Sequence, residues 1–130
     1  FLSKEFCPSP TYIRSLMSSQ TSAVLDPVEA QLIAYNARDV DKFMPCFTED
    51  CVVEDGQGNV LMQGNDAMRK SYKAMFEANP LLHCDVVTRI RAGEYVVDEE
   101  RVRGRGPAEI HVVVVYRLRS EQIAHVRILR

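Results

Sequence analysis

The chain has 130 residues, of which 46% are hydrophobic and 26% are charged, and its formal net charge is −2 at pH 7. This length indicates a single domain that can bury one core and one internal pocket. Basic residues are spread among acidic ones and no apolar run reaches the roughly 18 residues of a membrane span, so we expect neither a nucleic-acid surface nor a membrane segment.

Residues 1–26 are expected to form an N-terminal extension. Ser9-Pro10 could begin a helix, because Pro is favoured at the first helical position. This helix would need a surface to cover its narrow apolar stripe, either the domain itself or a partner subunit. The stripe consists of Tyr12, Ile13, Leu16 and Met17. The chain starts with neither an initiator Met nor a signal-peptide pattern, which indicates processing or a start inside a longer reading frame.

Three helices are expected in the first half of the domain, which spans residues 27–130. Asp26-Pro27 begins a helix that runs to about residue 38. Asp39 caps a short second helix with apolar residues at helical spacing. These residues are Val40, Phe43, Met44 and Phe47. Asn65 caps the third helix, which ends near Asn79-Pro80 because a residue before proline disfavours the helical conformation.

Strands and turns make up the rest of the domain. Residues 48–50 interrupt the helical pattern, and Cys51-Val52-Val53 begins a short strand that ends at Glu54 and Asp55. Further strands are predicted at 60–63, 81–91, 95–103, 110–119 and 122–129. Helices followed by a strand meander predict an α+β domain, in which about three helices cover one face of a curved antiparallel sheet.

The strand Ile110–Tyr116 is apolar on both faces. A half-solvated antiparallel strand alternates apolar and polar residues, so both faces of this strand must be covered. Helices can cover one face. The simplest cover for the outer face is a second copy of the chain, which predicts a homodimer through the outer face of the sheet.

The four cysteines, at positions 7, 46, 51 and 84, fit no zinc or haem spacing. We expect free, mostly buried thiols in a reducing cytoplasm. A Cys46–Cys51 bridge is the alternative.

The order of these elements resembles the nuclear transport factor 2-like superfamily, in its SnoaL-like and steroid Δ-isomerase-like branch. The resemblance lies in the stretch AYNARDVDKFMPCFTEDCVVED at 34–55, in GNDAMRKSYKAMF at 64–76 and in the last hairpin at 112–127. It implies a cone-shaped α+β barrel. It does not define the activity, because this fold carries isomerases, cyclases, dehydratases, epoxide hydrolases and non-enzymatic binders.

Asp55 is the candidate catalytic residue that the resemblance implies. In the isomerase branch an aspartate at this place shuttles a proton between carbons next to a carbonyl, with a pKa raised by apolar surroundings. Alternatively, Asp55 only caps the turn to Gly56. The two oxyanion donors of that branch are missing, since Gln31 and Val114 occupy their positions, and steroid isomerisation is therefore not expected. Tyr35 or Tyr72 could replace them, or could simply belong to the core.

Two further sets of residues could carry chemistry. With a two-residue turn at Ser120-Glu121, His125 lies opposite Tyr116, and a shift of one residue turns it to the other face. The segment 98–103 resembles the acid–arginine–acid relay of limonene-epoxide-hydrolase-like enzymes. Alternation lets either Asp98 and Glu100, or Glu99, Arg101 and Arg103, face inward together. For the histidines the alternative is a structural role at a dimer interface or at the end of the barrel. For the charged residues of 98–103 the alternative is an exposed position on the strand.

The leading hypothesis is a cofactor-free isomerase or cyclase for an apolar carbonyl-containing or cyclic small molecule. The alternatives are a dimeric binding module for a hydrophobic ligand, an epoxide-hydrolase-like enzyme, and a cone filled by its own side chains. No metal or phosphate motif occurs. The predicted ligand-contacting residues are Gln31, Tyr35, Phe43, Phe47, Met62, Tyr72, Met75, Phe76, Val112, Val114 and Tyr116.

Overall fold

The computed structural model describes residues 26–130, so the predicted helix after Ser9-Pro10 and the state of Cys7 lie outside the described residues. The helical elements are α3 (Pro27–Ala37), α4 (Val40–Phe43), the 3-10 turn η1 (Met44–Cys46) and α5 (Asn65–Ala78). The strands are β1 (Phe47–Asp55), β2 (Val60–Gln63), β3 (His83–Ala92), β4 (Tyr95–Arg103), β5 (Ile110–Arg119) and β6 (Gln122–Leu129).

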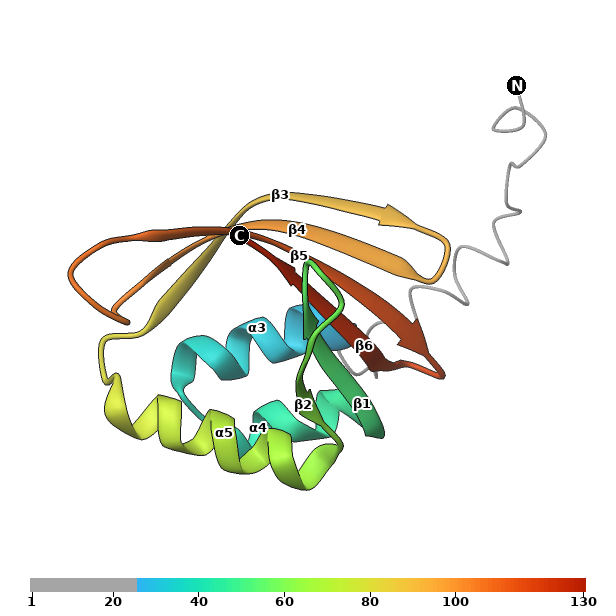
Figure 1. Ribbon diagram of the computed structural model, residues 1–130, viewed down its shortest axis with the longest axis horizontal. Coiled ribbons are helices and arrows are strands. Elements are labelled where there is room, and N and C mark those ends of the chain that lie inside the picture. Colours follow the sequence, from blue (N-terminus) through green and yellow to red (C-terminus); the bar gives the residue numbers. More distant parts are fainter. Residues whose placement is uncertain (1–25) are drawn as a thin grey trace, which may run out of the picture.

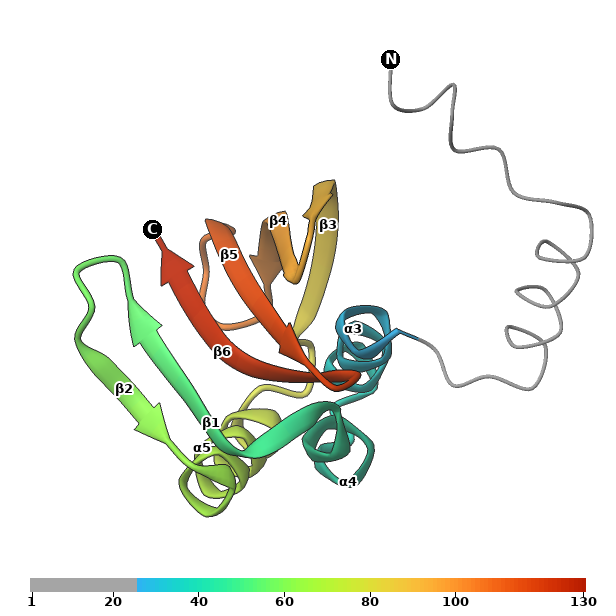
Figure 2. The same ribbon diagram turned by 90° about the vertical axis from the view of Figure 1, so that its right-hand side faces the viewer.

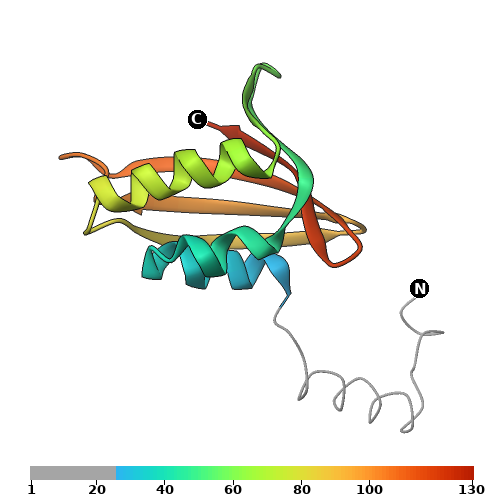
Figure 3. The same cartoon turned by 90° about the horizontal axis from the view of Figure 1, so that it is seen from below.

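The predicted α+β architecture is confirmed. The six strands form one curved sheet in the order β2-β1-β6-β5-β4-β3, and α3, α4 and α5 lie together on one face of it (Figures 1 and 3). The sheet is open, because β2 and β3 form its two edges (Figure 2). The space between the helices and the inner face of this sheet holds the core and the cavity described below.

The sheet was predicted to be wholly antiparallel, but it is mixed. β1 runs parallel to β6, whereas the other neighbouring strands are antiparallel. The β1–β2 hairpin and α5 precede a four-stranded meander, and the last strand of that meander returns beside β1. Alternation within a strand identifies its buried face but not its neighbour, so this pairing was not predicted.

Local sequence signals set both ends of α3. The carboxylate of Asp26 accepts hydrogen bonds from the backbone N–H groups of Val28 (3.2 Å) and Glu29 (3.3 Å). Arg38 ends the helix in the left-handed conformation, and its guanidinium donates to the carbonyl of Leu82 (2.8 Å). These contacts fix which face of α3 is turned toward the sheet.

The second helix is shorter than predicted. α4 ends at Phe43, and Phe47 begins β1 instead of continuing the helix. The helical pattern ends before 48–50, and β1 already includes these residues instead of beginning at Cys51. Pro45 in η1 explains the change, since proline has no N–H with which to continue a helix. In α5, Gly64 occupies the cap position and Asn65 is the first helical residue.

The β5–β6 hairpin has the shifted one of the two registers that the sequence left open. Ser120 and Glu121 both have positive φ (50° and 66°), as a two-residue hairpin turn requires. The pairing shifts beyond the turn, so that His125 lies opposite Arg117 and Tyr116 lies opposite Val126. His125 therefore faces the outer side of the sheet, away from Tyr116.

The core joins aromatic side chains of the helices to the inner face of the sheet. Phe43 is 1% exposed, and its ring lies 4.6 Å from that of Tyr72 and 4.8 Å from that of Phe47, centroid to centroid. Cys46, Cys51 and Cys84 are buried and free, so the alternative Cys46–Cys51 bridge is absent. Within residues 26–130, no helix is both long and apolar enough to span a membrane.

Candidate functional site

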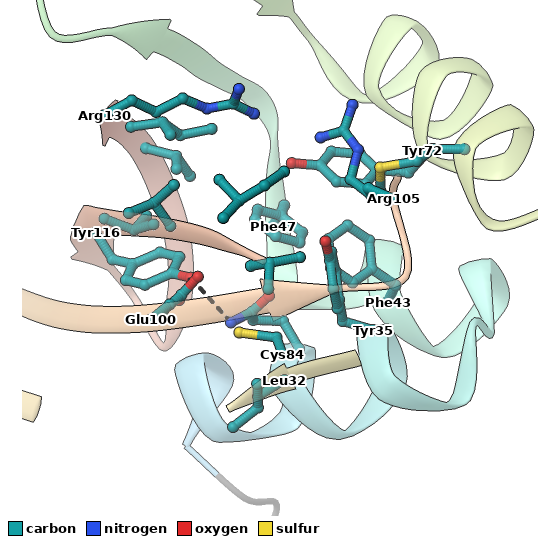
Figure 4. A pocket seen from close by; sticks show the side chains of 18 residues that line it. Leu32, Tyr35, Phe43, Phe47, Tyr72, Cys84, Glu100, Arg105, Tyr116 and Arg130 are labelled. Atoms are coloured by element: carbon teal, nitrogen blue, oxygen red, sulfur yellow. Dashed lines mark hydrogen bonds between the residues drawn. The ribbon is translucent and has the colours of Figure 1, made fainter. Parts of the chain in front are cut away.

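A cavity of about 110 Å³ lies between the helices and the inner face of the sheet (Figure 4). Its wall is mostly apolar, as small-molecule sites usually are. The lining residues are Gln31, Leu32, Tyr35, Phe43, Phe47, Tyr72, Met75, Cys84, Glu100, Val102, Arg105, Ile110, Val112, Val114, Tyr116, Val126, Ile128 and Arg130.

Glu100 is the buried carboxyl group of this cavity. Its residue is 7% exposed, and burial raises the pKa of its carboxyl group to about 7. The hydroxyl of Tyr116 donates a hydrogen bond to Oε1 of Glu100 (3.1 Å). Nε2 of Gln31 in turn donates to Oη of Tyr116 (3.1 Å) and to the carbonyl of Val28 (3.1 Å). The carboxyl group is thereby held in one position while it borders an apolar space.

Asp98, two residues before Glu100, also faces inward but is neutralised. Its carboxylate, which is fully buried, accepts hydrogen bonds from Nε (2.7 Å) and Nη2 (2.9 Å) of Arg89. The same guanidinium reaches Glu29 on α3 (2.7 Å). A buried charge needs such pairing. Glu100 has a phenol and a thiol as its main neighbours instead, so it is the group that can change its protonation state near neutral pH.

Two phenols point into the cavity from the helices, Tyr35 from α3 and Tyr72 from α5 (Figure 4). Burial raises the pKa of Tyr72 to about 12 and raises that of Tyr35 further, so both remain protonated donors. Neither hydroxyl is hydrogen-bonded to another residue of the described range 26–130. Either can therefore donate to an oxygen of a bound molecule.

Comparison with protein families identifies the domain. The family described as the SnoaL-like domain matches residues 28–126. The chain belongs to this family. Comparison with curated proteins gives no match.

Solved structures with the same fold as this SnoaL-like domain carry different names. An uncharacterised protein of cystatin fold from Novosphingobium aromaticivorans is 29% identical, with a TM-score of 0.76 over 82% of this chain and 97% of that one. A protein provisionally named a polyketide cyclase, from Sinorhizobium meliloti, is 24% identical, with a TM-score of 0.70 over 81% and 94%. An LEH-like epoxide hydrolase of M. tuberculosis is 19% identical, with a TM-score of 0.64 over 79% and 78%. The last two likenesses show the fold alone.

Most of the predicted ligand-contacting residues line the cavity of this SnoaL-like domain. They are Gln31, Tyr35, Phe43, Phe47, Tyr72, Met75, Val112, Val114 and Tyr116. Two others belong to the surrounding core instead. Met62 is partly buried against that core, and Phe76 is 5% exposed, with its ring 5.5 Å from those of Tyr35 and Phe43.

Asp55 lies outside the cavity lining. Its Oδ1 accepts hydrogen bonds from the backbone N–H groups of Gln57 and Asn59, and its Oδ2 accepts one from Nδ2 of Asn59, all at 2.9 Å. These bonds, that from the Asn59 side chain above all, hold the pKa of the Asp55 carboxyl group below its ordinary value. The geometry is that of a turn cap, and the proton-shuttle role of Asp55 stays a prediction that this geometry does not support.

The histidines pair with carboxylates away from the cavity. In each pair, Nε2 of the histidine lies close to a carboxylate oxygen. The distances are 3.0 Å for His83–Asp85, 2.8 Å for His111–Glu99 and 3.2 Å for His125–Glu54. Arg101 and Arg103 are likewise exposed and ion-paired. Of the two alternating sets in 98–103, Asp98 and Glu100 are therefore the inward pair. Residues 26–130 contain no cluster of His, Cys, Asp or Glu that could hold a metal ion.

Three polar residues of the cavity were not predicted as its lining: Glu100, Arg105 and Cys84. The signal for Glu100 was present in the alternation of 96–102, where two acids, Asp98 and Glu100, stand between Val96 and Val102 at inward positions. Its position opposite Val112 and its contact with Tyr116 depend on the β4–β5 register. Arg105 lies in the loop between β4 and β5, and the structure turns it toward the cavity.

Proposed function

We propose that this SnoaL-like domain is a cofactor-free enzyme that moves a proton next to the carbonyl group of a small, apolar, cyclic molecule, with Glu100 as the acid–base residue. One observation carries the proposal: Glu100 is buried against an apolar cavity, and the pKa of its carboxyl group is about 7. An acid–base catalyst works best when its pKa is near the operating pH, because it can then both accept and return a proton.

The proposed steps use groups that the cavity already holds. The Glu100 carboxylate takes a proton from the carbon next to the carbonyl. The C–H electron pair forms a C=C bond to the carbonyl carbon, and the C=O π pair moves to the oxygen, which gives an enolate. The enolate oxygen accepts a hydrogen bond from the hydroxyl of Tyr35 or Tyr72, which supplies the stabilisation that the missing oxyanion donors do not. Protonated Glu100 then returns the proton to the same carbon or to a conjugated one.

The same cavity supports the alternative of a binding module that holds a hydrophobic molecule without converting it. The pKa of Glu100 favours the enzyme, because a binding site has no need of a buried acid that is half ionised near neutral pH. The free thiols of Cys46, Cys51 and Cys84 favour a reducing compartment, and we propose the cytoplasm.

Solvent-deuterium incorporation into a panel of cyclic ketones, followed by NMR, tests the proposal. We expect exchange with the wild type and a decrease of about a hundredfold or more in Glu100→Gln, since a positioned acid–base group contributes at least that factor. Asp55→Asn is the matched control, also an acid-to-amide change, and should keep its exchange rate. Loss of exchange in Asp55→Asn but not in Glu100→Gln would return the role to Asp55. Binding of the ketones without exchange in the wild type would establish the binding module.

A further inference from the structure

Arg105 and Arg130 give the cavity a positively charged mouth. Arg105 lies in the loop between β4 and β5, and Arg130 follows the end of β6. Both line the cavity, and both also line an open groove that continues from it past Ile128 toward the Asp55 turn. Figure 4 shows the two guanidinium groups at the side of the cavity away from Leu32 and Cys84.

These two guanidinium groups differ from the others in residues 26–130. Eight of the other arginines form an ion pair with an acidic side chain, and Arg38 donates to backbone carbonyls. Arg105 and Arg130 form neither kind of contact with another residue of that range. Asp55 lines the same groove, but both of its oxygens are occupied within its own turn. The mouth therefore offers positive charge that the described protein does not neutralise.

Arg105 acts on the interior of the cavity. Burial is the main cause that raises the pKa of Tyr72, and the positive charge of Arg105 is the one influence that lowers it. The same charge acts on Tyr35. Arg105 and both phenols line the same cavity, so a ligand held by the phenols lies near this guanidinium.

The enclosed volume limits the part of a ligand that can lie inside. A cavity of about 150 Å³ lined by apolar side chains holds benzene, and this cavity measures about 110 Å³. One small ring fits when the side chains adjust slightly, whereas a fused-ring molecule does not. Any further part of the ligand must leave through the mouth, between the two arginines.

We propose that Arg105, with Arg130, binds the carboxylate of the substrate, so that the substrate is a single-ring carbonyl compound carrying a carboxylate on a short arm. The ring lies in the apolar cavity with its carbonyl toward the phenols, and the carboxylate lies at the mouth. A guanidinium is suited to this task because its planar N–H groups match the two oxygens of a carboxylate. The inference rests on the proposed function for the carbonyl, but the carboxylate site is independent of proton transfer.

The test compares two probes by NMR titration at pH 7.5, 3-(4-oxocyclohexyl)propanoate and its methyl ester, in which a methyl group removes the negative charge. The wild type should bind the carboxylate about tenfold more tightly than the ester, as expected for one charge-assisted contact at a partly exposed site. Arg105→Gln should lose this preference and keep its affinity for the ester. Arg103→Gln, which removes the same charge from an outward-facing arginine, should keep the preference.

Several outcomes would overturn the carboxylate site. The first is equal affinity of the wild type for both probes, and the second is no binding of either probe. The third is a loss of preference in Arg103→Gln as large as that in Arg105→Gln, which would indicate a general charge effect. Arg105→Lys keeps the charge and provides a second variant should Arg105→Gln unfold; it should retain part of the preference. Glu100→Gln should keep the preference for the carboxylate while it loses deuterium exchange. The binding preference therefore tests the carboxylate site, and deuterium exchange tests the proton-transfer proposal.

Discussion

Glu100 and Asp98 show at the scale of single residues how two neighbouring inward positions of β4 acquire different chemistry. Both carboxyl groups are buried, but only Asp98 is paired with a guanidinium. The negative charge of Asp98 adds to burial in raising the pKa of Glu100. Arg89 thus supports the site indirectly, since its guanidinium pairs with Asp98 and leaves Glu100 without a cationic hydrogen-bond partner.

The raised pKa of Glu100 should make the protein less stable as the pH rises. The carboxyl group has a pKa of about 4.3 when unfolded and about 7 when folded, so the folded state binds more protons between these values. Its contribution to stability is complete below about pH 4 and is lost as the pH rises to about 7. Between pH 5 and pH 8, the free energy of unfolding of the wild type should fall by roughly 2–3 kcal/mol relative to that of Glu100→Gln. Urea unfolding of both proteins at the two pH values measures this difference, and a difference independent of pH would contradict the buried, titrating Glu100.

Sequence reasoning identified most of the apolar wall but favoured a different acid. The wall residues recur at helical or alternating spacing, which depends on local geometry alone and can be recognised in the sequence. Asp55 stands out because it ends a strand, yet Asp before Gly is also a common turn cap, and local pattern does not separate the two roles. Alternation offers Asp98 and Glu100 only as one of two possible inward sets. The pairing of β4 with β5, which brings Tyr116 within reach of Glu100, is a property of the tertiary structure.

At the scale of elements, the end of β4 positions Arg105 through Gly104. This glycine has a φ of +90°, and a Cβ atom on it would lie 2.2 Å from the carbonyl oxygen of Leu81. Gly104→Ala combines an unfavourable backbone conformation with a collision against backbone. We expect a loss of at least roughly 2 kcal/mol of unfolding free energy.

Gly106→Ala is the matched control for this prediction. Gly106 lies two residues further along the same loop and has open space around its Cβ position. Its substitution should leave the urea midpoint nearly unchanged. Equal midpoints for both variants would show that the loop can move away from Leu81, and Arg105 would then not be held in one place.

The register of β5 and β6 explains why elements were predicted better than their contacts. The turn at Ser120-Glu121 and the limits of both strands follow from composition. The irregularity between Arg117 and Leu118, which turns His125 outward, has no signal in the apolar pattern, since Ala124 is compatible with either face. The same holds for the parallel β1–β6 pair, which depends on where the meander closes.

At the scale of the whole molecule, the outer face of the sheet carries an apolar row across three strands. Ile90, Val97 and Val115 lie opposite one another on β3, β4 and β5. Ile90 is 58% exposed, and the two valines are only half-buried. Val113 extends the row, and the Glu54–Arg127 and Glu99–His111 pairs border it. An apolar centre with a polar rim is the usual composition of a protein–protein interface.

We therefore expect a homodimer formed by this face, with Val115 near its centre. Val115→Lys would place an unpaired charge in the interface, and the dissociation constant of the dimer should rise at least about thirtyfold, the effect of a central contact worth about 2 kcal/mol. Val60→Lys is the control, because Val60 is 55% exposed on β2, close to the opposite edge of the sheet. Sedimentation equilibrium of the three proteins measures the constants. A monomeric wild type would contradict the dimer, whereas equal weakening by both lysines would place the interface elsewhere.

Because the cavity opens on the inner face, Val115→Lys should leave deuterium exchange unchanged at concentrations where the wild type is dimeric. Unchanged exchange would show that each subunit holds a complete site.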